Sequence, residues 1–327
     1  MTALRKPEVI GVITAGGDAP GMNAAIRAVV RAALSHGLEV IGIRRGYRGV
    51  YEKDFFVMNS RHVSGIINLG GTILKSVRFP EFQRPEVRWQ AARNLQEAKI
   101  DALVVIGGDG SCRGALALSE TSGFPVVTIP ASIDNDIAGT DITVGFDTAV
   151  NTAVEAIDRI RDTATSHDRT FVIEVMGRHC GNLALAVGLA CGAEIVLIPE
   201  RPSNEEAIFQ EVESADRKGK ESVLIILAEG AGRAAELTEV LSRRFPDKEV
   251  RYAVLGYVQR GGRPCSASRN LATRLGVKAV EGLLAGKTCH LVAWVKGAVT
   301  FVPLSEVVQG KPKVSLEYLD LVKLLSI

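Results

Sequence analysis

The sequence has few cysteines, and its charges nearly cancel. Its 327 residues include five cysteines, which are scattered, odd in number and without a CxxC pair. This usage indicates neither a disulfide framework nor a zinc site, and it favours a reducing compartment. Lys and Arg number 39 against 37 Asp and Glu, which gives a formal net charge of +2. A nucleic-acid partner recognised by bulk charge is therefore not expected.

Long apolar runs are absent too. Charged residues or glycine interrupt each hydrophobic run well short of a membrane span, and residues 1–8 lack the apolar core of a signal peptide. We therefore expect no membrane partner and a cytoplasmic location. The 5 histidines show no HExxH or other ligand spacing, and no GxSxG motif occurs. The histidines are interpreted as structural or solvated, and acyl transfer is not expected.

Short β-branched runs alternate with helical stretches along most of the chain. Parallel strands need long crossovers, so this alternation predicts an α/β fold with helices on both faces of a parallel sheet. The predicted strands are Glu8–Thr14, Leu38–Arg44, Ala102–Ile106, Val126–Ile129, Phe171–Val175, Ile195–Ile198, Val223–Ala228, Val250–Leu255, Leu291–Val295 and Val299–Val302. The predicted helices are Met22–Ser35, Val87–Ala98, Ser111–Glu120, Thr148–Arg161, Leu183–Cys191, Glu205–Lys218, Ala235–Arg244 and Ser268–Leu284.

Neither a low-complexity linker nor an internal repeat marks a domain boundary. With 46% of 327 residues hydrophobic, the chain can bury one large core or two moderate ones. The length favours two. We predict the boundary near Asp141–Asp147, where the first four strand candidates end.

The segment Thr128–Asp147, TIPASIDNDIAGTDITVGFD, holds the densest set of carboxylates. Apolar residues lead into and out of it, so Asp134, Asn135 and Asp136 are expected in a loop after a buried strand. In a locally extended loop, residues two apart share a face, and Asp134 and Asp136 then point at one ligand. One carboxylate can hold a metal while the other takes a proton. The alternative is an Asx-rich turn in which the carboxylates bond their own backbone.

Two predicted strands run into glycine-rich turns that open helices. These turns are AGGDAPGMN at residues 15–23 and GGDGS at residues 107–111. Two such turns at neighbouring strand ends form a crevice for phosphates, although neither has GxGxxG or P-loop spacing. The first turn alone can equally be a tight turn without a ligand. Asp109 in the second turn would repel a phosphate unless a cation such as Mg²⁺ bridges the two.

Arginines lie beside glycines or aromatic residues in several predicted loops. Each offers a rigid bidentate fork for phosphate oxygens, and any one of them can equally form a surface salt bridge. The GGDG pattern also occurs in NAD kinases and lipid kinases, so it indicates nucleotide phosphate binding without choosing an acceptor. The loop arginines are Arg78, Arg169, Arg178, Arg251 and Arg260.

Six segments between residues 16 and 262 carry a family resemblance: GGDAPGMNAAIR, GGTILKSVRFPEF, VIGGDGS, IDNDIAGTD, EVMGRHCG and LGYVQRGG. Through them the chain resembles bacterial-type ATP-dependent 6-phosphofructokinases over most of its length. The resemblance implies transfer of the γ-phosphoryl of ATP to the 1-hydroxyl of fructose 6-phosphate, with Mg²⁺, in a cytoplasmic, glycolytic homotetramer. It also implies two doubly wound α/β domains. The ATP-binding domain is then 1–144 plus about 258–308, and the sugar-phosphate and effector domain is 145–257 plus about 309–327.

The resemblance implies roles residue by residue. Asp134 is then the base that takes the sugar hydroxyl proton, Asp136 and Arg178 complete the catalytic set, and Asp109 holds Mg²⁺. The implied ATP-binding residues are Gly17, Tyr47, Arg78, Phe79, Gly108, Asp109, Gly110 and Ser111. The implied sugar-phosphate residues are Ser132, Ile133, Asp134, Met176, Gly177, Arg178, Glu229, Tyr257 and Arg260, with Arg169 and Arg251 supplied by a neighbouring subunit.

By the same resemblance, ADP or phosphoenolpyruvate binds at a second intersubunit site. Arg27 and Arg31 lie four apart on a predicted helix and can grip one phosphate together. One arginine of the family's site is replaced by Ser60, and Arg61 in an extended segment would point to the opposite face. We therefore expect weaker effector binding and a shallow response. The implied effector residues are Arg27, Arg31, Arg161, Gly192, Glu194, Lys218 and Lys220.

Four positions depart from the family pattern: Lys75 and Ala131 replace Gly, Ser132 replaces Thr, and Tyr257 replaces His. Lys75 and Tyr257 change charge and shape near the expected phosphates. A pyrophosphate-dependent phosphofructokinase would typically carry Asp at the position of Gly110 and Lys at that of Ala131. Both residues are small here, so ATP is favoured. The sequence is also compatible with a kinase of another phosphosugar, such as sedoheptulose 7-phosphate, and less so with a non-catalytic regulatory subunit that binds sugar phosphate.

Overall fold

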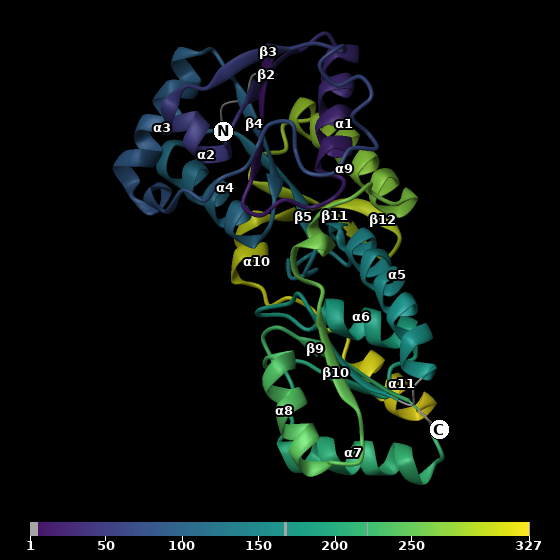
Figure 1. The fold of residues 1–327 in the computed structure, drawn as a ribbon. Coiled ribbons are helices and arrows are strands. Elements are labelled where there is room, and N and C mark those ends of the chain that lie inside the picture. The colour runs from purple at the N-terminus through teal and green to yellow at the C-terminus, as the bar shows by residue number, and fades with distance from the viewer. Residues whose placement is uncertain (1–5, 167–168, 221, 327) are drawn as a thin grey trace. The chain divides into compact units, whose positions relative to one another are not determined.

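The structure, a computed structural model, describes residues 6–166, 169–220 and 222–326 (Figure 1). Its strands are β1 (Val9–Ala15), β2 (Glu39–Ile43), β3 (Phe55–Met58), β4 (Ala102–Gly107), β5 (Val126–Ser132), β6 (Val144–Gly145), β7 (Thr170–Val175), β8 (Ile195–Leu197), β9 (Val223–Ala228), β10 (Val250–Val254), β11 (His290–Val295) and β12 (Ala298–Pro303). Its α-helices are α1 (Met22–Ser35), α2 (Gly46–Glu52), α3 (Pro85–Glu97), α4 (Asp109–Ser122), α5 (Phe146–Thr165), α6 (Asn182–Cys191), α7 (Glu205–Arg217), α8 (Ala234–Arg244), α9 (Ser266–Leu284), α10 (Leu304–Gln309) and α11 (Glu317–Leu325). Two 3₁₀-helices are η1 (Pro80–Gln83) and η2 (Gly256–Arg260).

The chain divides into two units, each with its own sheet. Unit 1 comprises Met1–Thr148 and Arg260–Lys313, and unit 2 comprises Ala149–Gln259 and Val314–Ile327. No helix in the described ranges combines the length and apolar composition that a bilayer span requires.

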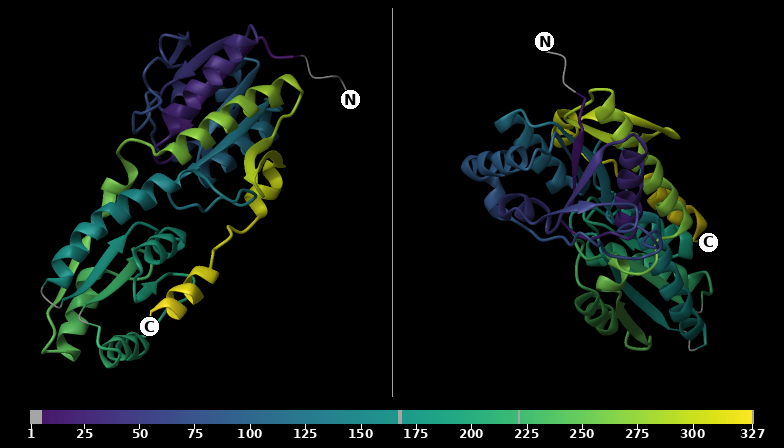
Figure 2. Two further views of the ribbon diagram at one scale, coloured as in Figure 1. Left: turned by 90° about the vertical axis from the view of Figure 1, so that its right-hand side faces the viewer. Right: turned by 90° about the horizontal axis from the view of Figure 1, so that it is seen from above.

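Unit 1 is built on a sheet with the strand order β12-β11-β5-β4-β1-β2-β3, and the short β6 pairs with β5. The strands from β11 to β2 are parallel neighbours, whereas the edge strands β3 and β12 are antiparallel to their partners. Helices α2, α3, α4 and α10 cover one face, and α1 with α9 covers the other (Figures 1 and 2). Because both faces are covered, β4 is buried along its whole length.

Helices α1 and α9 pack closely because Gly276 lies at their contact. A Cβ atom at Gly276 would stand 2.6 Å from Ala28 Cβ and 3.0 Å from the carbonyl oxygen of Ala25. Any side chain there forces the helices apart, which is a destabilising change in a packed interior. This contact holds α1, and therefore the turn that precedes it, against the sheet.

Unit 2 has a smaller, parallel sheet with the order β10-β7-β9-β8. Helices α7 and α8 supply apolar side chains to the core on one face, and α6 packs on β8 and β9 with α11 against it. The carboxyl ends of β7 and β9 are neighbours, so the residues that follow these strands lie together.

The predicted α/β class is confirmed, and every strand and helix predicted from the sequence is present with ends that differ by a few residues. The sequence patterns did not predict five short elements, which are β3, β6, α2, α10 and α11. Helix α2 follows Arg45, which has a φ of 63°, and its N-cap makes no side-chain hydrogen bond. With seven residues it is also too short to show a helical period in the sequence.

Candidate active site

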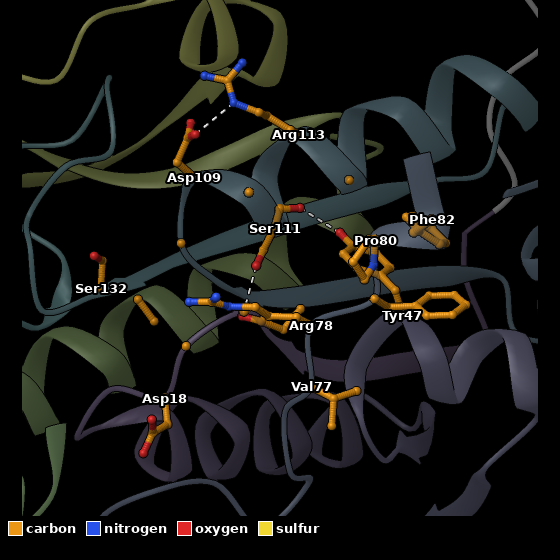
Figure 3. Close-up of a pocket in the computed structure, with 18 of the residues that line it drawn as sticks. Asp18, Tyr47, Val77, Arg78, Pro80, Phe82, Asp109, Ser111, Arg113 and Ser132 are labelled. Carbon is orange, nitrogen blue, oxygen red and sulfur yellow. Dashed lines mark hydrogen bonds and ion pairs between the residues drawn. The ribbon is translucent and has the colours of Figure 1, made fainter. Parts of the chain in front are cut away.

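A cavity of about 750 Å³ opens in unit 1 beyond the carboxyl ends of β1, β4 and β5 (Figure 3). After β1 the chain continues to β2 on one side, whereas after β4 it continues to β5 on the other. The loops that follow β1 and β4 therefore turn away from each other and leave a crevice, the usual ligand position in such sheets. Residues 15–18 and 108–111 of these loops line the cavity.

The two glycine-rich turns contact each other. Ser111 Oγ, in the second turn, donates a hydrogen bond of 2.9 Å to the carbonyl oxygen of Ala15 at the end of β1. A Cβ atom at Gly107 would stand 2.4 Å from both that oxygen and Ser111 Oγ, so only glycine allows the approach. Both turns thus bring their backbones to one cavity, where a phosphate group can meet N–H donors.

Asp109 begins α4, in the first turn, where the helix dipole stabilises a carboxylate. Its Oδ2 lies 2.8 Å from Nε of Arg113, one turn later on the same helix (Figure 3). Among the described residues, no three His, Cys, Asp or Glu side chains gather into a metal cluster. Mg²⁺ commonly takes one or two carboxylates together with waters and substrate phosphates. Asp109 therefore fits an ion that arrives with a nucleotide.

Aromatic side chains form another wall of the cavity. The rings of Tyr47 and Phe82 stack with centroids 4.2 Å apart, and the Tyr47 hydroxyl donates to the carbonyl oxygen of Ser111 at 2.6 Å. Tyr47 is 8% exposed, and this burial raises its pKa well above the usual value, so the phenol stays protonated. Arg78 and Phe79 also line the cavity. Such a wall suits the flat apolar face of a nucleotide base.

Asp134 and Asp136 both line the same cavity. Of the two conformations considered for the loop between them, the extended one is wrong, because Asn135 has a φ of 50°, in the left-handed region that Asn tolerates better than most residues. Ser132 Oγ closes the turn: it accepts from the Asp134 N–H at 3.2 Å and donates to Asp136 Oδ1 at 2.8 Å. A closed turn, rather than extended alternation, brings the two carboxylates to one cavity.

Arg260, at the end of η2, reaches the first glycine-rich turn. A Cβ atom at Gly17 would stand 2.5 Å from Arg260 Nη1, so the guanidinium lies against the glycine. The sugar-phosphate residues implied by the resemblance that line this cavity are Ser132, Ile133, Asp134 and Arg260.

The other implied sugar-phosphate residues belong to unit 2. Met176, Gly177 and Arg178 follow β7, and Glu229 follows the neighbouring β9, with its N–H donating to Val175 O at 2.9 Å. The Met176 N–H donates to the buried side-chain oxygen of Gln259 at 2.9 Å, which ties this loop to η2. Tyr257, in η2, is 83% exposed.

Arg169 and Arg251 lie at the opposite end of the unit 2 sheet from Arg178. Arg169 precedes β7 and Arg178 follows it, and the six residues of this strand span about 20 Å. Glu249 forms ion pairs with both of the first two arginines, at 2.8 Å to Arg169 and 2.6 Å to Arg251. The neighbouring guanidinium groups, that of Arg169 first and then that of Arg251, lower the pKa of Glu249 to about 2.

The implied effector residues are also divided. Arg161 donates to the carbonyl oxygens of Cys191 and Gly192, and Glu194 accepts from Lys220 at 2.9 Å and from the Leu224 N–H at 2.7 Å. Lys218 donates to Ser326 O at 2.7 Å. These residues are in unit 2, whereas Arg27 and Arg31 lie on α1 in unit 1.

Two expectations about single residues change. The segment around Ser60 is a turn rather than extended chain, because Asn59 Oδ1 accepts from the N–H groups of Arg61 and His62 at 3.0 and 3.3 Å. Lys75 has a φ of 58°, a conformation that explains why a glycine is common there, and its exposed side chain is not part of the cavity lining. Its carbonyl oxygen accepts from Thr14 Oγ1 at 2.9 Å.

Sequence reasoning missed several cavity residues, whose position depends on the tertiary fold. Arg88, for example, donates to the carbonyl oxygens of Phe82 and Gln83 and to Thr121 Oγ1, and so links η1 to α4. The spacing of four between Asp109 and Arg113 was the one local signal available. The missed residues include Asp18, Val77, Phe82, Arg88, Arg113 and Gly114.

Known proteins are similar in sequence to this chain over nearly its full length. The family model described as Phosphofructokinase matches residues 9–283. ATP-dependent 6-phosphofructokinase 1 of Thermus thermophilus is 52% identical over 320 residues, covering 97% of this chain and 99% of that protein. ATP-dependent 6-phosphofructokinase of Clostridioides difficile is 49% identical over 320 residues, covering 98% of this chain and 100% of that protein.

Solved structures share the fold. Pichia pastoris phosphofructokinase in the T-state matches with a TM-score of 0.86 at 38% identity, covering 93% of this chain. This chain spans 36% of the Pichia chain. A pyrophosphate-dependent phosphofructokinase from Marinobacter aquaeolei matches with a TM-score of 0.85 at 23% identity, covering 95% of this chain and 86% of that one. At that identity the likeness shows the fold alone.

Proposed function

The chain belongs to the phosphofructokinase family, and we propose that it transfers the γ-phosphoryl group of ATP to the 1-hydroxyl of fructose 6-phosphate. The products are ADP and fructose 1,6-bisphosphate. The observation that carries the proposal is the single cavity that collects two glycine-rich turns and the Asp134–Asp136 loop. Phosphoryl transfer depends mainly on positioning donor and acceptor and on neutralising charge, and this cavity has the groups for both.

Asp134 acts as the base in this proposal. Its carboxylate takes the proton from the sugar 1-hydroxyl while that oxygen bonds to the γ-phosphorus and the bond from phosphorus to the β-phosphate oxygen breaks. The hydrogen bonds through Ser132 hold Asp134 and Asp136 in their turn, which keeps the base in place. Asp109, with Asp136 assisting, would hold Mg²⁺, and the bound ion neutralises phosphate charge.

We assign nucleotide binding to unit 1 and the remaining sugar-phosphate contacts, with most of the effector site, to unit 2. The implied ATP-binding residues all belong to unit 1, which supports the first assignment. Arg169 and Arg251 lie a strand's length from Arg178, so one sugar phosphate cannot contact all three within a subunit. This separation supports an oligomer in which the two arginines serve a neighbour. The homotetramer, the ADP or phosphoenolpyruvate site and the cytoplasmic location stay predictions.

ATP rather than pyrophosphate is the proposed donor. A Cβ atom at Gly110 would meet nothing within 4 Å, so the glycine leaves room that an Asp would fill with charge. The relatives at 49% and 52% identity are named as ATP-dependent enzymes. Tyr257 is proposed to donate to the 6-phosphate. Because it stands where the family has His, a second phosphosugar acceptor is included in the test.

The test is a coupled assay with four substrate pairs: ATP or pyrophosphate as donor, and fructose 6-phosphate or sedoheptulose 7-phosphate as acceptor. We expect the highest kcat/KM with ATP and fructose 6-phosphate. Faster turnover of pyrophosphate would overturn the donor, and faster turnover of sedoheptulose 7-phosphate would overturn the acceptor. Absence of turnover with all four pairs in a folded protein would favour the regulatory subunit.

A further inference from the structure

Arg113 lines the cavity and forms its ion pair with Asp109, the carboxylate that is proposed to hold Mg²⁺ (Figure 3). We propose that Arg113 is a nucleotide phosphate ligand that Asp109 holds in place until the nucleotide arrives. When the nucleotide binds, the Asp109 carboxylate turns to the metal ion and the Arg113 guanidinium turns to a phosphate oxygen. The inference rests on the proposed function and adds a specific binding residue to it.

The Arg113 guanidinium has more hydrogen-bond donors than its ion pair with Asp109 uses. In the described part of the chain, Arg113 makes one hydrogen bond, from Nε to Asp109 Oδ2, and its two terminal NH₂ groups make none. A planar guanidinium presents donors in a fork that matches phosphate oxygens. Arg113 can therefore contact a phosphate through its terminal groups before or after it leaves Asp109.

Breaking the ion pair between Arg113 and Asp109 costs little free energy. The side chains of Arg113 and Asp109 are 53% and 35% exposed, and a solvated pair with this helical spacing is worth roughly a factor of two in an equilibrium. A charge-assisted contact to a phosphate contributes about tenfold to a hundredfold in affinity. The exchange of partners is therefore favourable once a phosphate is present.

The negative charge of Asp109 suits it to a metal ion, and the same charge requires a neighbouring cation when no metal ion is bound. A bare carboxylate at the start of α4 repels a phosphate, and Arg113 removes that repulsion before any ion is bound. Three other arginines line the cavity: Arg78, Arg88 and Arg260. Arg88 donates to the carbonyl oxygens of Phe82 and Gln83, and Arg260 lies against Gly17. Arg113 is thus the guanidinium that is paired with the metal-binding carboxylate.

An ordinary surface ion pair is the competing interpretation, and the chain contains a matched example. Arg48 and Glu52 on α2 have the same spacing, lie 2.7 Å apart and are 48% and 35% exposed. Neither lines the cavity. Arg48→Gln therefore removes an equivalent ion pair without touching the proposed site, and it serves as the control.

The experiment measures binding rather than turnover, with a non-hydrolysable ATP analogue (AMP-PNP) and no sugar phosphate. Calorimetric titrations compare wild type, Arg113→Gln, Arg113→Lys and Arg48→Gln, each with excess Mg²⁺ and with EDTA. We expect Arg113→Gln to weaken binding about tenfold or more with Mg²⁺ and by a larger factor in EDTA, where Asp109 faces the phosphates alone. Arg113→Lys should lie between, and Arg48→Gln should match wild type.

A double variant separates the two parts of the inference. Adding Asp109→Asn to Arg113→Gln should restore part of the EDTA binding, because the repulsive carboxylate is gone, and should not restore the Mg²⁺-dependent binding. Binding by Arg113→Gln within twofold of wild type in both conditions would overturn the inference while the proposed function stands. Wild type that fails to bind AMP-PNP at all would instead overturn the nucleotide site. Thermal unfolding of each variant confirms that the exposed substitutions leave the fold intact.

Discussion

Arg251 donates two hydrogen bonds to one carboxylate oxygen of Glu249, from Nε at 2.9 Å and from Nη2 at 2.6 Å. The other oxygen of Glu249 lies 2.8 Å from Nε of Arg169. One carboxylate thus keeps two guanidinium groups together at the amino-terminal end of β7 and β10, an arrangement ready for a phosphate.

Subunits should complement one another if Arg251 serves a neighbouring site. A mixture of Asp134→Asn and Arg251→Ala subunits should regain activity, because some sites then combine an intact base with an intact arginine. Activity is measured after subunit exchange has been verified by mass. The control mixes Asp134→Asn with Arg178→Ala, whose lesions belong to the same subunit's site and should not complement. Activity no greater than the sum of the two parents in the first mixture would count against shared sites.

Glu249 should stabilise the protein in a pH-dependent way. Its pKa is lowered to about 2 from an ordinary 4.5, so the folded state favours the ionised form. The stabilisation is complete above the unfolded pKa and is lost as the pH falls through the folded pKa. Wild type should therefore unfold at a higher temperature than Glu249→Gln at neutral pH, and the difference should shrink between about pH 4.5 and 2.

The matched control for that measurement is Glu155→Gln. Glu155 pairs with Arg159 at 2.7 Å, but both side chains are more exposed than those around Glu249, so its loss should change the unfolding temperature little. A wild-type advantage over Glu249→Gln that is the same from pH 7 to pH 2 would assign the effect to packing rather than to charge.

Asp134→Asn should abolish most turnover while nucleotide binding and the fold persist, because the side-chain shape is kept and only the proton acceptor is lost. Loss of a general base costs about 10²–10⁴ in rate. The control is Asp141→Asn in the same loop, since Asp141 accepts from the Lys296 N–H at 2.6 Å and does not line the cavity. If kcat of Asp134→Asn stays within about tenfold of wild type, another group takes the proton.

Gly110→Asp should weaken ATP binding without unfolding the protein, because a Cβ atom there meets nothing within 4 Å. The added carboxylate enters the space of the phosphates and repels them. Gly110→Ala and Gly110→Asn separate the contributions of size and charge, and we expect the order Ala, Asn, Asp in rising KM for ATP. Equal KM values for Asn and Asp would leave bulk alone as the cause.

Ser60→Arg should strengthen the response to ADP and phosphoenolpyruvate. One restored charge-assisted contact is worth roughly 1.5–3 kcal/mol, or about 10–100-fold in effector affinity. Both effectors are titrated at subsaturating fructose 6-phosphate. Ser64→Arg adds the same charge within the same turn and should change little. Strong regulation of wild type that Ser60→Arg does not increase would show that the missing arginine is unimportant.

Elements with an unambiguous period were predictable from the sequence. Helix Met22–Ser35 was placed to the residue, because its apolar positions recur at helical spacing after a glycine-rich turn. Strand β3 was missed, because it has four residues at a sheet edge and only Met58 is buried. Such a segment buries too little to leave a hydrophobic pattern.

The site residues also differ in whether the local sequence predicts their position. Asp109, with its glycine turn, carries a local signal, whereas the ion pairs of Glu249 depend on the pairing of β7 with β10, whose residues are about 80 positions apart. The left-handed conformation of Asn135 was also beyond reach, since Asn tolerates that region without requiring it. Long-range pairing and backbone conformation at single residues are properties of the folded chain.

Unit 1 is formed by two segments that are far apart in the sequence, and this affects how the chain folds while the ribosome synthesises it. Strand β5 ends at Ser132, but its parallel neighbour β11 begins only at His290, and α1 likewise lacks α9 until the chain is nearly complete. At about 5–20 residues per second, the roughly 160 intervening residues take on the order of 10–30 s to emerge from the ribosome. During that interval the β5 edge and the surface of α1 that packs on α9 are exposed to solvent. We therefore expect the nascent chain to depend on chaperones or on prompt completion to avoid aggregation.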